Sequence, residues 1–276
     1  MTDIANSEAS LGSAVRPAGN RPALIFAARV LFLVLILAAW QGAVAAGLAS
    51  AAFVSTPIGV AQSLWQLFRD GEILPDLGTT VLEIVIAFSL SVVFGISSAV
   101  VLDRNDWLNR IVSPFLTAFN SMPRIALGPL FILWFGIGIA SKVVLAFSLG
   151  YFIMLLSTLG GLKNVDRDLL LMSRLFGASE LRLFRHVRFP WALPGIFAGL
   201  KLTLIYCSAG AVIGEMIAAK SGLGVLLQSY SGRFDIAGVL ALILIVALLV
   251  MTLTALMDMI ERRLLEWSRG STDVPG

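Results

Sequence analysis

The chain has 276 residues, of which 58% are hydrophobic and only 13% are charged, and its mean hydropathy is +0.92. A soluble domain carries about 25% charged residues, so this composition excludes an ordinary water-soluble domain and favours an integral membrane protein. The single cysteine and the single histidine, Cys207 and His186, exclude an intrachain disulfide, a cysteine-rich metal site, a zinc cluster and bis-histidine haem ligation. We therefore expect no metal site in this chain.

The chain begins with a polar segment and an apolar one. Residues 1–22 are polar and rich in small side chains, and we interpret them as a disordered cytoplasmic tail. The run 23–48 contains one charge, Arg29, and is long enough to cross a bilayer, which takes about 20 residues. Its end resembles a signal-peptidase site, but the apolar part of a signal peptide is only about 7–15 residues long. We interpret this run as the first span.

A short helix outside the bilayer is predicted next, in "STPIGVAQSLWQLFRDGEILPDLG". Ser55 or Thr56 can cap it, Pro57 suits its first turn and Gly71 suits its stop. Four apolar side chains are expected to share one face of this amphipathic helix, namely Ile58, Leu64, Trp65 and Phe68.

Further apolar runs predict spans 2 to 6, over residues 77–102, 109–136, 142–162, 191–218 and 236–260. The third contains Pro114, Pro123 and Pro129, so we expect it to be broken or kinked. In the fifth, Gly195 with Gly199 and Gly210 with Gly214 favour close helix packing, although glycine is also tolerated in a lipid-facing helix. The fold class is all-α: a polytopic membrane protein with about six transmembrane helices over residues 23–265, followed by a cytoplasmic tail, 266–276.

The basic residues predict the orientation, because cytoplasmic loops carry the excess of lysine and arginine. With six spans, most basic residues fall on one side, namely Arg16, Arg21, Arg104, Arg110, the cluster 163–188, Arg262, Arg263 and Arg269. The other side has only Arg69, Lys142, Lys220 and Arg233. Both termini are therefore expected in the cytoplasm.

The interval 163–190 between spans 4 and 5 contains two predicted helices. The first covers about 166–176, with Asn164 or Asp166 as its cap and Gly177 as a left-handed stop. Ser179 can cap the second, and Pro190 is expected to end it. The second helix has an apolar face and a neighbouring basic face, formed by Leu181, Phe184 and Val187 and by Arg182, Arg185 and Arg188. Such a helix lies on anionic lipid headgroups or docks on a partner protein, and the residues leave both readings open.

This interval also resembles the EAA loop of the permease subunits of ATP-binding-cassette (ABC) importers. That loop has a glycine followed, after nine residues, by an aliphatic residue, one variable position and Leu-Pro. In "GASELRLFRHVRFPWALPGIFAGLKL", Gly177, Val187, Phe189 and Pro190 occupy those positions. The stretches "STPIGVAQSLWQL", "MPRIALGPLFILWFGIGIASK" and "GEMIAAKSGLGVLL" are similar to the nitrate/sulfonate/taurine-type branch. The resemblance extends over residues 53–263.

The resemblance implies a type I ABC importer permease fold in the inner membrane. Its function would be to translocate a small solute, such as nitrate, a sulfonate, taurine, a related organic anion or a vitamin precursor. The implied partners are a separate ATP-hydrolysing subunit, an external solute-binding protein, a second permease copy in a homodimer or a relative of this chain, and the lipid bilayer, with no nucleic acid. The chain has no Gly-Lys dipeptide and thus no Walker A motif, so ATP and magnesium would bind to the partner, and this chain would be neither an enzyme nor a cofactor-binding protein.

The resemblance also implies which residues couple to the ATPase. They are Leu171, Met172, Ser173, Arg174, Gly177, Ala178 and Ser179, with Pro190 and Pro194 at the exit of the loop. The Glu-Ala-Ala that names the loop falls on Leu171, Met172 and Ser173 in this chain. In relatives the glutamate can pair with a basic group on the ATPase, and Leu171 cannot. A more apolar contact, or a divergent partner, is expected.

Two other classes of function make different demands on the sequence. An ion-coupled secondary transporter needs carboxylates near the middle of the membrane, and only Glu83 and Glu215 lie well inside apolar sequence. We expect both to lie in an outer or inner third of a span, where they can snorkel to water, and Lys201 to reach the cytoplasmic interface. A membrane enzyme needs a nucleophile with a base, or a metal, and Cys207 has no base nearby in the sequence.

Arg124 and its neighbours Pro123 and Pro129 are candidates for the translocation pathway. An arginine is expensive in lipid, and backbone freed by proline is tolerated only against protein or a water-filled cavity. Arg124 either snorkels at the cytoplasmic interface or lies on the pathway, where its guanidinium could hold an anion bidentately.

Overall fold

The computed structural model describes residues 22–71 and 73–264. The predicted tails, 1–22 and 266–276, lie outside these residues, apart from Pro22, which begins the first helix. Every regular element in the described ranges is helical, which confirms the all-α class. The chain forms two compact units, described over residues 22–59 and 60–264.

The first unit contains α1 (Pro22–Ala45), α2 (Ala51–Val54) and the beginning of α3 (Pro57–Arg69). The segment Leu24–Ala45 is long and apolar enough to cross a membrane, as predicted for the first span. The amide of Gly59 donates a hydrogen bond to the Thr56 hydroxyl at 3.0 Å, and Gly71 beyond α3 has a φ of +70°. The predicted cap and stop of α3 are therefore confirmed.

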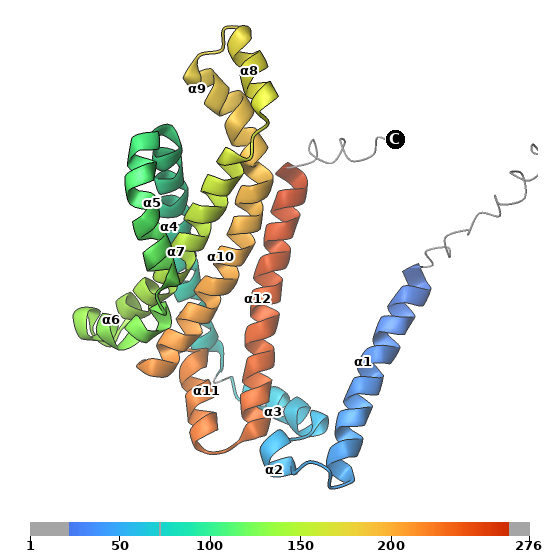
Figure 1. The fold of residues 1–276 in the computed structure, drawn as a ribbon. Coiled ribbons are helices and arrows are strands. Elements are labelled where there is room, and N and C mark those ends of the chain that lie inside the picture. Colours follow the sequence, from blue (N-terminus) through green and yellow to red (C-terminus); the bar gives the residue numbers. More distant parts are fainter. Residues whose placement is uncertain (1–21, 72, 265–276) are drawn as a thin grey trace, which may run out of the picture. The chain divides into compact units, whose positions relative to one another are not determined.

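The second unit is built around three long helices that lie side by side, α4 (Ile73–Arg104), α7 (Ile139–Lys163) and α10 (Phe189–Ile217) (Figure 1). A fourth long helix, α12 (Ile236–Leu264), packs on α10. The centre of this unit is filled by small and aliphatic side chains, namely Ile84, Ala87, Val143, Ala146, Leu204, Cys207 and Ala211. With α1, five helices in the described chain are long and apolar enough to span a membrane, or six if a bent pair forms one span.

Glycines allow α10 to approach α7 closely. A Cβ atom at Gly210 would lie 2.7 Å from the Cα of Ala146, and one at Gly199 would lie 2.5 Å from the Cβ of Ser157. Added Cβ atoms at Gly195 and Gly214 would each lie 3.2 Å from an atom of α7. The predicted packing role of these glycines is confirmed, because all four face α7 rather than lipid.

The bent pair is the predicted third span. It consists of α5 (Asp106–Ser121), the 3₁₀ turn η2 (Arg124–Leu127) and α6 (Gly128–Phe135), with an 81° bend between the two parts. The expected break is confirmed, and it falls at Met122 and Pro123. The other two prolines do not break the helix: Pro114 lies inside α5, and Pro129 lies in the first turn of α6, where a missing N–H is tolerated.

Three short elements lie between α7 and α10, and they are found at the opposite end of this unit from α11 (Leu223–Gly232) (Figure 1). They are α8 (Arg167–Leu175), α9 (Glu180–Leu183) and the π-helical turn η3 (Phe184–Arg188). The caps are as predicted: the side chain of Asp166 accepts from the Asp168 amide at 2.8 Å, and that of Ser179 from the Arg182 amide at 3.4 Å. Gly177 has a φ of +77°, which confirms the left-handed stop.

The predicted end of the second short helix at Pro190 is wrong. Helical structure continues without a break from Glu180 to Ile217. A proline inside a regular α-helix clashes with the carbonyl four residues earlier and donates no hydrogen bond. The π turn before it, in which the Phe189 amide donates to the Phe184 carbonyl, widens the helix there. The wider turn accommodates Pro190 in the first turn of α10, without ending the helix.

Candidate functional site

The loop formed by α8 and α9 exposes large apolar side chains. Leu175 and Phe176 are 85% and 86% exposed, and Leu171 and Met172 are also more than half exposed. Soluble surfaces seldom leave contiguous side chains of this size in water, and such a patch marks a binding surface. Leu171, at the position of the glutamate in the loop's usual motif, thus belongs to an exposed apolar patch.

The remaining predicted coupling residues lie at and around the turn of this loop. Gly177 makes the turn between the helices, followed by Ala178 and Ser179, and the Arg174 guanidinium pairs across it with Glu180 at 3.1 Å. The Ser173 hydroxyl donates to the carbonyl of Leu169 at 2.7 Å. A groove of about 380 Å³ lies beside the turn, lined by Ser173, Phe176, Ala178, Arg182, Leu183, His186 and Val187.

The loop is tied to the neighbouring span as well as to its own helices. Arg188 pairs with Asp103 at 3.1 Å, and Asp103 is close to the end of α4. The next residue, Arg104, places its guanidinium carbon 4.7 Å from the centre of the Phe184 ring. Pro190 and Pro194 lie in the adjoining part of α10. These contacts give the loop a defined position against the end of α4.

Arg124 lies at the bend of the third span and is held by the chain itself. One terminal nitrogen donates to the Ser148 carbonyl at 2.6 Å, and the other donates to the Asn120 side-chain oxygen at 2.6 Å and to the Asn120 carbonyl at 3.2 Å. The guanidinium also stacks 4.6 Å from the centre of the Phe152 ring. Both terminal nitrogens are thus engaged, so a bidentate grip on an anion is not available in this arrangement.

Arg124 borders a groove of about 400 Å³ that the sequence did not reveal. Its other lining residues are Asn120, Met122, Pro123, Ile125, Leu149, Ile153 and Tyr206. Pro123 therefore lines the same groove as Arg124, whereas Pro129 is not among these residues. The role of the three on a translocation pathway stays a prediction.

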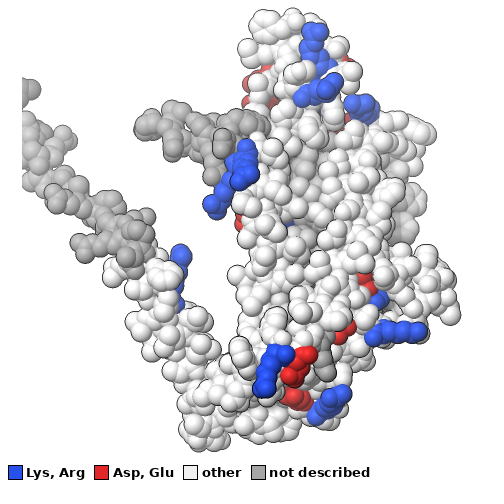
Figure 2. All heavy atoms as spheres, turned by 180° about the vertical axis from the view of Figure 1, so that it is seen from behind, with Lys and Arg blue, Asp and Glu red and all other residues white. Residues whose placement is uncertain are grey.

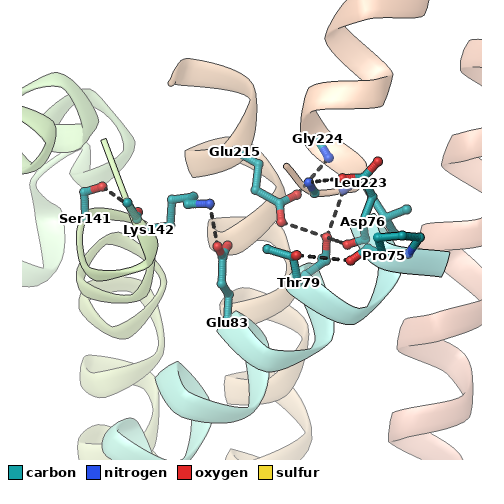
Figure 3. A network of polar contacts seen from close by, with 12 residues as sticks. Pro75, Asp76, Thr79, Glu83, Ser141, Lys142, Glu215, Leu223 and Gly224 are labelled. Carbon is teal, nitrogen blue, oxygen red and sulfur yellow. Dashed lines mark hydrogen bonds and ion pairs between the residues drawn. The ribbon is translucent and has the colours of Figure 1, made fainter. Parts of the chain in front are cut away.

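A buried polar network joins α4, α7 and α10 at the end of the unit opposite α8 and α9 (Figure 3). The Lys142 ammonium and the Glu83 carboxylate form an ion pair, and their side chains are 4% and 0% exposed. Glu215 is also fully buried, and it accepts hydrogen bonds from the Thr80 hydroxyl at 2.7 Å and from the Gly224 amide at 2.8 Å. Each carboxylate therefore has a charged or hydrogen-bonding partner.

The same network holds the connection between α10 and α11. The Gly222 amide donates to the Asp76 carboxylate at 2.7 Å, and the Leu223 amide donates to the Thr80 hydroxyl at 2.9 Å. Gly222 has a φ of +123°, and a Cβ atom at Gly224 would lie 2.7 Å from the Cβ of Glu215. Both positions thus require glycine, which gives a physical reason for the stretch "GEMIAAKSGLGVLL".

The expectation that Glu83 and Glu215 snorkel to water is wrong. Both side chains have 0% exposure. Snorkelling needs a long side chain near a free surface, and here partners on neighbouring helices and on the α10–α11 connection surround the carboxylates. The signal in the sequence was the presence of Gly222 and Gly224, because a side chain at either position would collide with Glu215.

Lys201 forms a second charged cluster, between α10 and α12. Its ammonium lies 2.5 Å from the Asp258 carboxylate and 2.5 Å from that of Glu261. The lysine is partly exposed, as are both acidic side chains. Lys201 was predicted only to extend toward an interface. In the structure it also links two spans, α10 and α12.

These features together define a class of protein. A helical membrane protein with five or six spans, a broken third span and a helix–glycine–helix loop carrying an exposed apolar patch is a membrane permease. Residues 91–266 match the binding-protein-dependent transport system inner membrane component family. The chain belongs to this family, and it is a membrane-spanning permease subunit of an ABC importer, a transport component and not an enzyme. Membership implies an ATP-hydrolysing partner and a substrate-binding protein.

Several relatives align along most of the chain. A riboflavin transport system permease protein of Chloroflexus aurantiacus is 32% identical over 235 residues, which cover 85% of this chain and 88% of the relative. A putative aliphatic sulfonates transport permease protein of Escherichia coli is 31% identical, covering 84% and 89%. A formylaminopyrimidine transport permease protein of Halalkalibacterium halodurans is 35% identical, covering 70% and 77%.

The fold is shared with solved transporters. A methionine ABC transporter in inward-facing conformations superposes with a TM-score of 0.62 at 23% sequence identity, covering 72% of this chain and 96% of that chain. An amino acid ABC transporter gives a TM-score of 0.59 at 16% identity, covering 72% and 97%. The predicted type I importer permease fold is thereby confirmed.

Proposed function

We propose that this permease is driven through the loop of α8 and α9, which docks on the ATP-hydrolysing subunit. The observation that carries the proposal is the exposure of Leu175 and Phe176 directly before the left-handed glycine turn at Gly177. A single amphipathic helix would suffice to lie on lipid, whereas this loop pairs α8 with α9 across a left-handed glycine turn. Two helices joined by such a turn present one surface to a partner, as a docking element must.

The orientation follows from the same loop. Figure 2 shows basic and acidic side chains at both ends of the second unit, with basic ones prominent at the end that carries the loop, and a band almost free of charge between the ends. Among the described residues, the loop end has more arginines and lysines outside the ion pairs than the opposite end has, which favours the cytoplasmic side. We place both chain termini in the cytoplasm for the same reason. The α10–α11 connection then lies on the outer side.

The transported solute is proposed to be small and polar, and to be delivered by an external binding protein. Relatives are named for riboflavin, aliphatic sulfonates, taurine and formylaminopyrimidine. We propose two copies of this chain in the transporter, since a pathway between two permease surfaces needs a second wall. ATP and magnesium would bind only to the partner subunit, because this chain lacks a Walker A motif, and no cofactor is proposed for it.

The docking of the loop can be tested by site-directed crosslinking. The native Cys207 is buried and is first replaced by alanine. Single cysteines are then introduced as Ser173→Cys or Ser179→Cys, and the complex is purified from membranes with its ATPase subunit. We expect both variants to crosslink to the ATPase with a short bifunctional reagent. Ser231→Cys, on an exposed position at the opposite end, is the matched control and is expected not to crosslink. Absence of loop crosslinks in an intact complex would overturn the proposal.

A further inference from the structure

The helix α5 is divided lengthwise into a polar and an apolar side. It has seven polar residues among sixteen, namely Asp106, Asn109, Arg110, Ser113, Thr117, Asn120 and Ser121. At about 100° per residue, all seven fall within an arc of roughly 120° around the helix axis. We call this side the α5 polar face. An arrangement of this kind is usual for a surface helix in water, but α5 is one part of the bent helix pair that is long and apolar enough to form a membrane span.

One flank of the apolar side of α5 packs on the protein, whereas Trp107, Ile111, Phe115 and Phe119 are exposed. Leu108, Val112 and Leu116 contact a core cluster formed by Ala99, Leu102, Leu155 and Leu159 of α4 and α7. Figure 1 shows α5 running alongside α4, a helix that is long and apolar enough to span a membrane. No side chain of α5 is fully buried. Ser113, Thr117 and Ser121 of the polar face are all exposed.

Lipid is a poor environment for this face. The hydroxyls of Thr117 and Ser121 donate to carbonyls one turn earlier, at 3.1 and 2.9 Å, and could be tolerated among acyl chains. Asn109 and Arg110 lie in the first turns of α5, where Arg110 is expected at the cytoplasmic side, but the Asn120 amide near the bend needs water or a protein partner at membrane depth. The face is therefore expected to meet a water-filled space or another polar surface.

Arg124 extends the α5 polar face beyond the end of the helix. Its guanidinium donates a hydrogen bond to the Asn120 side-chain oxygen and stacks on the Phe152 ring. It forms no ion pair with a carboxylate in the described part of the chain. The groove beside it, of about 400 Å³, also carries the exposed ring of Tyr206. The face thus ends at a fixed positive charge that no carboxylate of the described chain neutralises.

We propose that the α5 polar face lines the solute pathway and that the fixed charge of Arg124 selects a small anion. This deepens the proposed function and rests on it, because the opposite wall is supplied by the second permease copy. The hydroxyls and amides of the face exchange hydrogen bonds with the solute in place of water, and Arg124 attracts negative charge at the bend. Because the chain already holds both terminal nitrogens of Arg124, its contribution is the charge and not a two-point grip.

Accessibility to charged thiol reagents tests the first half of the proposal. In the Cys207→Ala background, single cysteines are introduced as Ser113→Cys, Thr117→Cys or Ser121→Cys on the polar face and as Ala118→Cys or Phe115→Cys outside it. The whole transporter, with ATPase and binding protein, is reconstituted and treated with membrane-impermeant methanethiosulfonates. We expect rapid labelling of the three polar-face variants, with loss of uptake, and labelling of the two controls at least tenfold more slowly. Equal labelling of both sides, or none on the polar face, would overturn a pathway role.

The sign of the reagent tests the second half. For the Ser121→Cys variant, the rates with an anionic and a cationic methanethiosulfonate are each divided by the rate for a free thiol in water. We expect the anionic reagent to be favoured several-fold, the preference to persist with Arg124→Lys and to disappear with Arg124→Gln. A preference that survives Arg124→Gln would contradict the role of Arg124 while leaving the pathway intact. The proposed coupling is tested separately, by the loop crosslinks from Ser173→Cys and Ser179→Cys, so the two proposals fail separately.

Discussion

Lys142 and Glu83 form an ion pair inside the helix bundle, with the ammonium nitrogen 2.5 Å from a carboxylate oxygen. The two residues belong to α7 and α4, and the pair lies beside the network that holds the α10–α11 connection (Figure 3). Removing one partner would leave the other charge buried without compensation, whereas removing both leaves none. We therefore expect a single substitution in this pair to lower the stability more than the double substitution does.

We expect Lys142→Met to destabilise the permease by about 3–5 kcal/mol, because Glu83 is then buried and unpaired. The double variant Lys142→Met/Glu83→Gln is expected to recover most of this loss. Thermal unfolding in detergent, followed by tryptophan fluorescence, measures both. A double variant as unstable as the single one would show that the charge pair is not the origin of the effect.

Glu215→Gln should loosen the α10–α11 connection. An amide has one oxygen in place of the two carboxylate oxygens, so either the Thr80 hydroxyl or the Gly224 amide loses its acceptor. The cost of an unsatisfied buried donor is about 1–3 kcal/mol. We expect hydrogen exchange of the Gly224 amide to become roughly tenfold faster or more, since about 1.4 kcal/mol corresponds to a factor of ten. Amides in the middle of α12 serve as the internal reference and should not change.

Gly177→Val should impair coupling without preventing membrane insertion. The left-handed backbone at this position costs an L-residue about 1 kcal/mol or more, so the angle between α8 and α9 would shift. Uptake and co-purification of the ATPase are both expected to fall. Gly160→Val is the matched control, because an added Cβ there meets nothing within 4 Å and the backbone is helical. Equal uptake by the two variants would refute a conformational role for Gly177.

Gly210→Ala should separate α10 from α7. The added methyl carbon would lie 2.7 Å from the Cα of Ala146, which is backbone and cannot rotate away. Overpacking of this kind costs about 1–3 kcal/mol, and we expect the unfolding temperature in detergent to fall. Gly160→Ala, in open space on α7, is expected to be neutral or slightly stabilising. A Gly210→Ala protein as stable as this control would mean that the helices can move apart freely.

The proposed orientation predicts where fused reporters are active. Fusions after Gly71 and Gly232 should report the outer side of the membrane, and fusions after Asn105 and Gly270 the cytoplasm. An alkaline phosphatase reporter is active only outside and a fluorescent protein only inside, so the two activities report the location of each fusion site independently. An outer location for the fusion after Gly270 would reverse the topology.

The sequence was most informative where a local signal is sufficient. Hydropathy located the long spans, and the residues at Thr56, Asp166, Ser179 and Gly177 marked helix starts and a stop that the structure confirms. These predictions succeed because caps and left-handed glycines act over one helical turn.

The sequence was least informative where distant segments meet. The Glu215–Thr80 hydrogen bond joins residues 135 positions apart, and no local pattern brings them together. The prediction of a helix end at Pro190 was wrong because a π turn, which has no sequence signature, accommodates this proline inside the helix.

The uninterrupted helix from Glu180 to Ile217 has a mechanical consequence. At 1.5 Å per residue, its 38 residues correspond to about 57 Å of helical path. The path begins in the loop of α8 and α9, passes through the π turn η3 and Pro194, where helices commonly bend, and ends next to Glu215 and the α10–α11 connection. Under the proposed docking, a displacement of the loop would travel along this single helix, past the glycine contacts with α7, and would reach the surroundings of Glu215 without crossing a connecting loop.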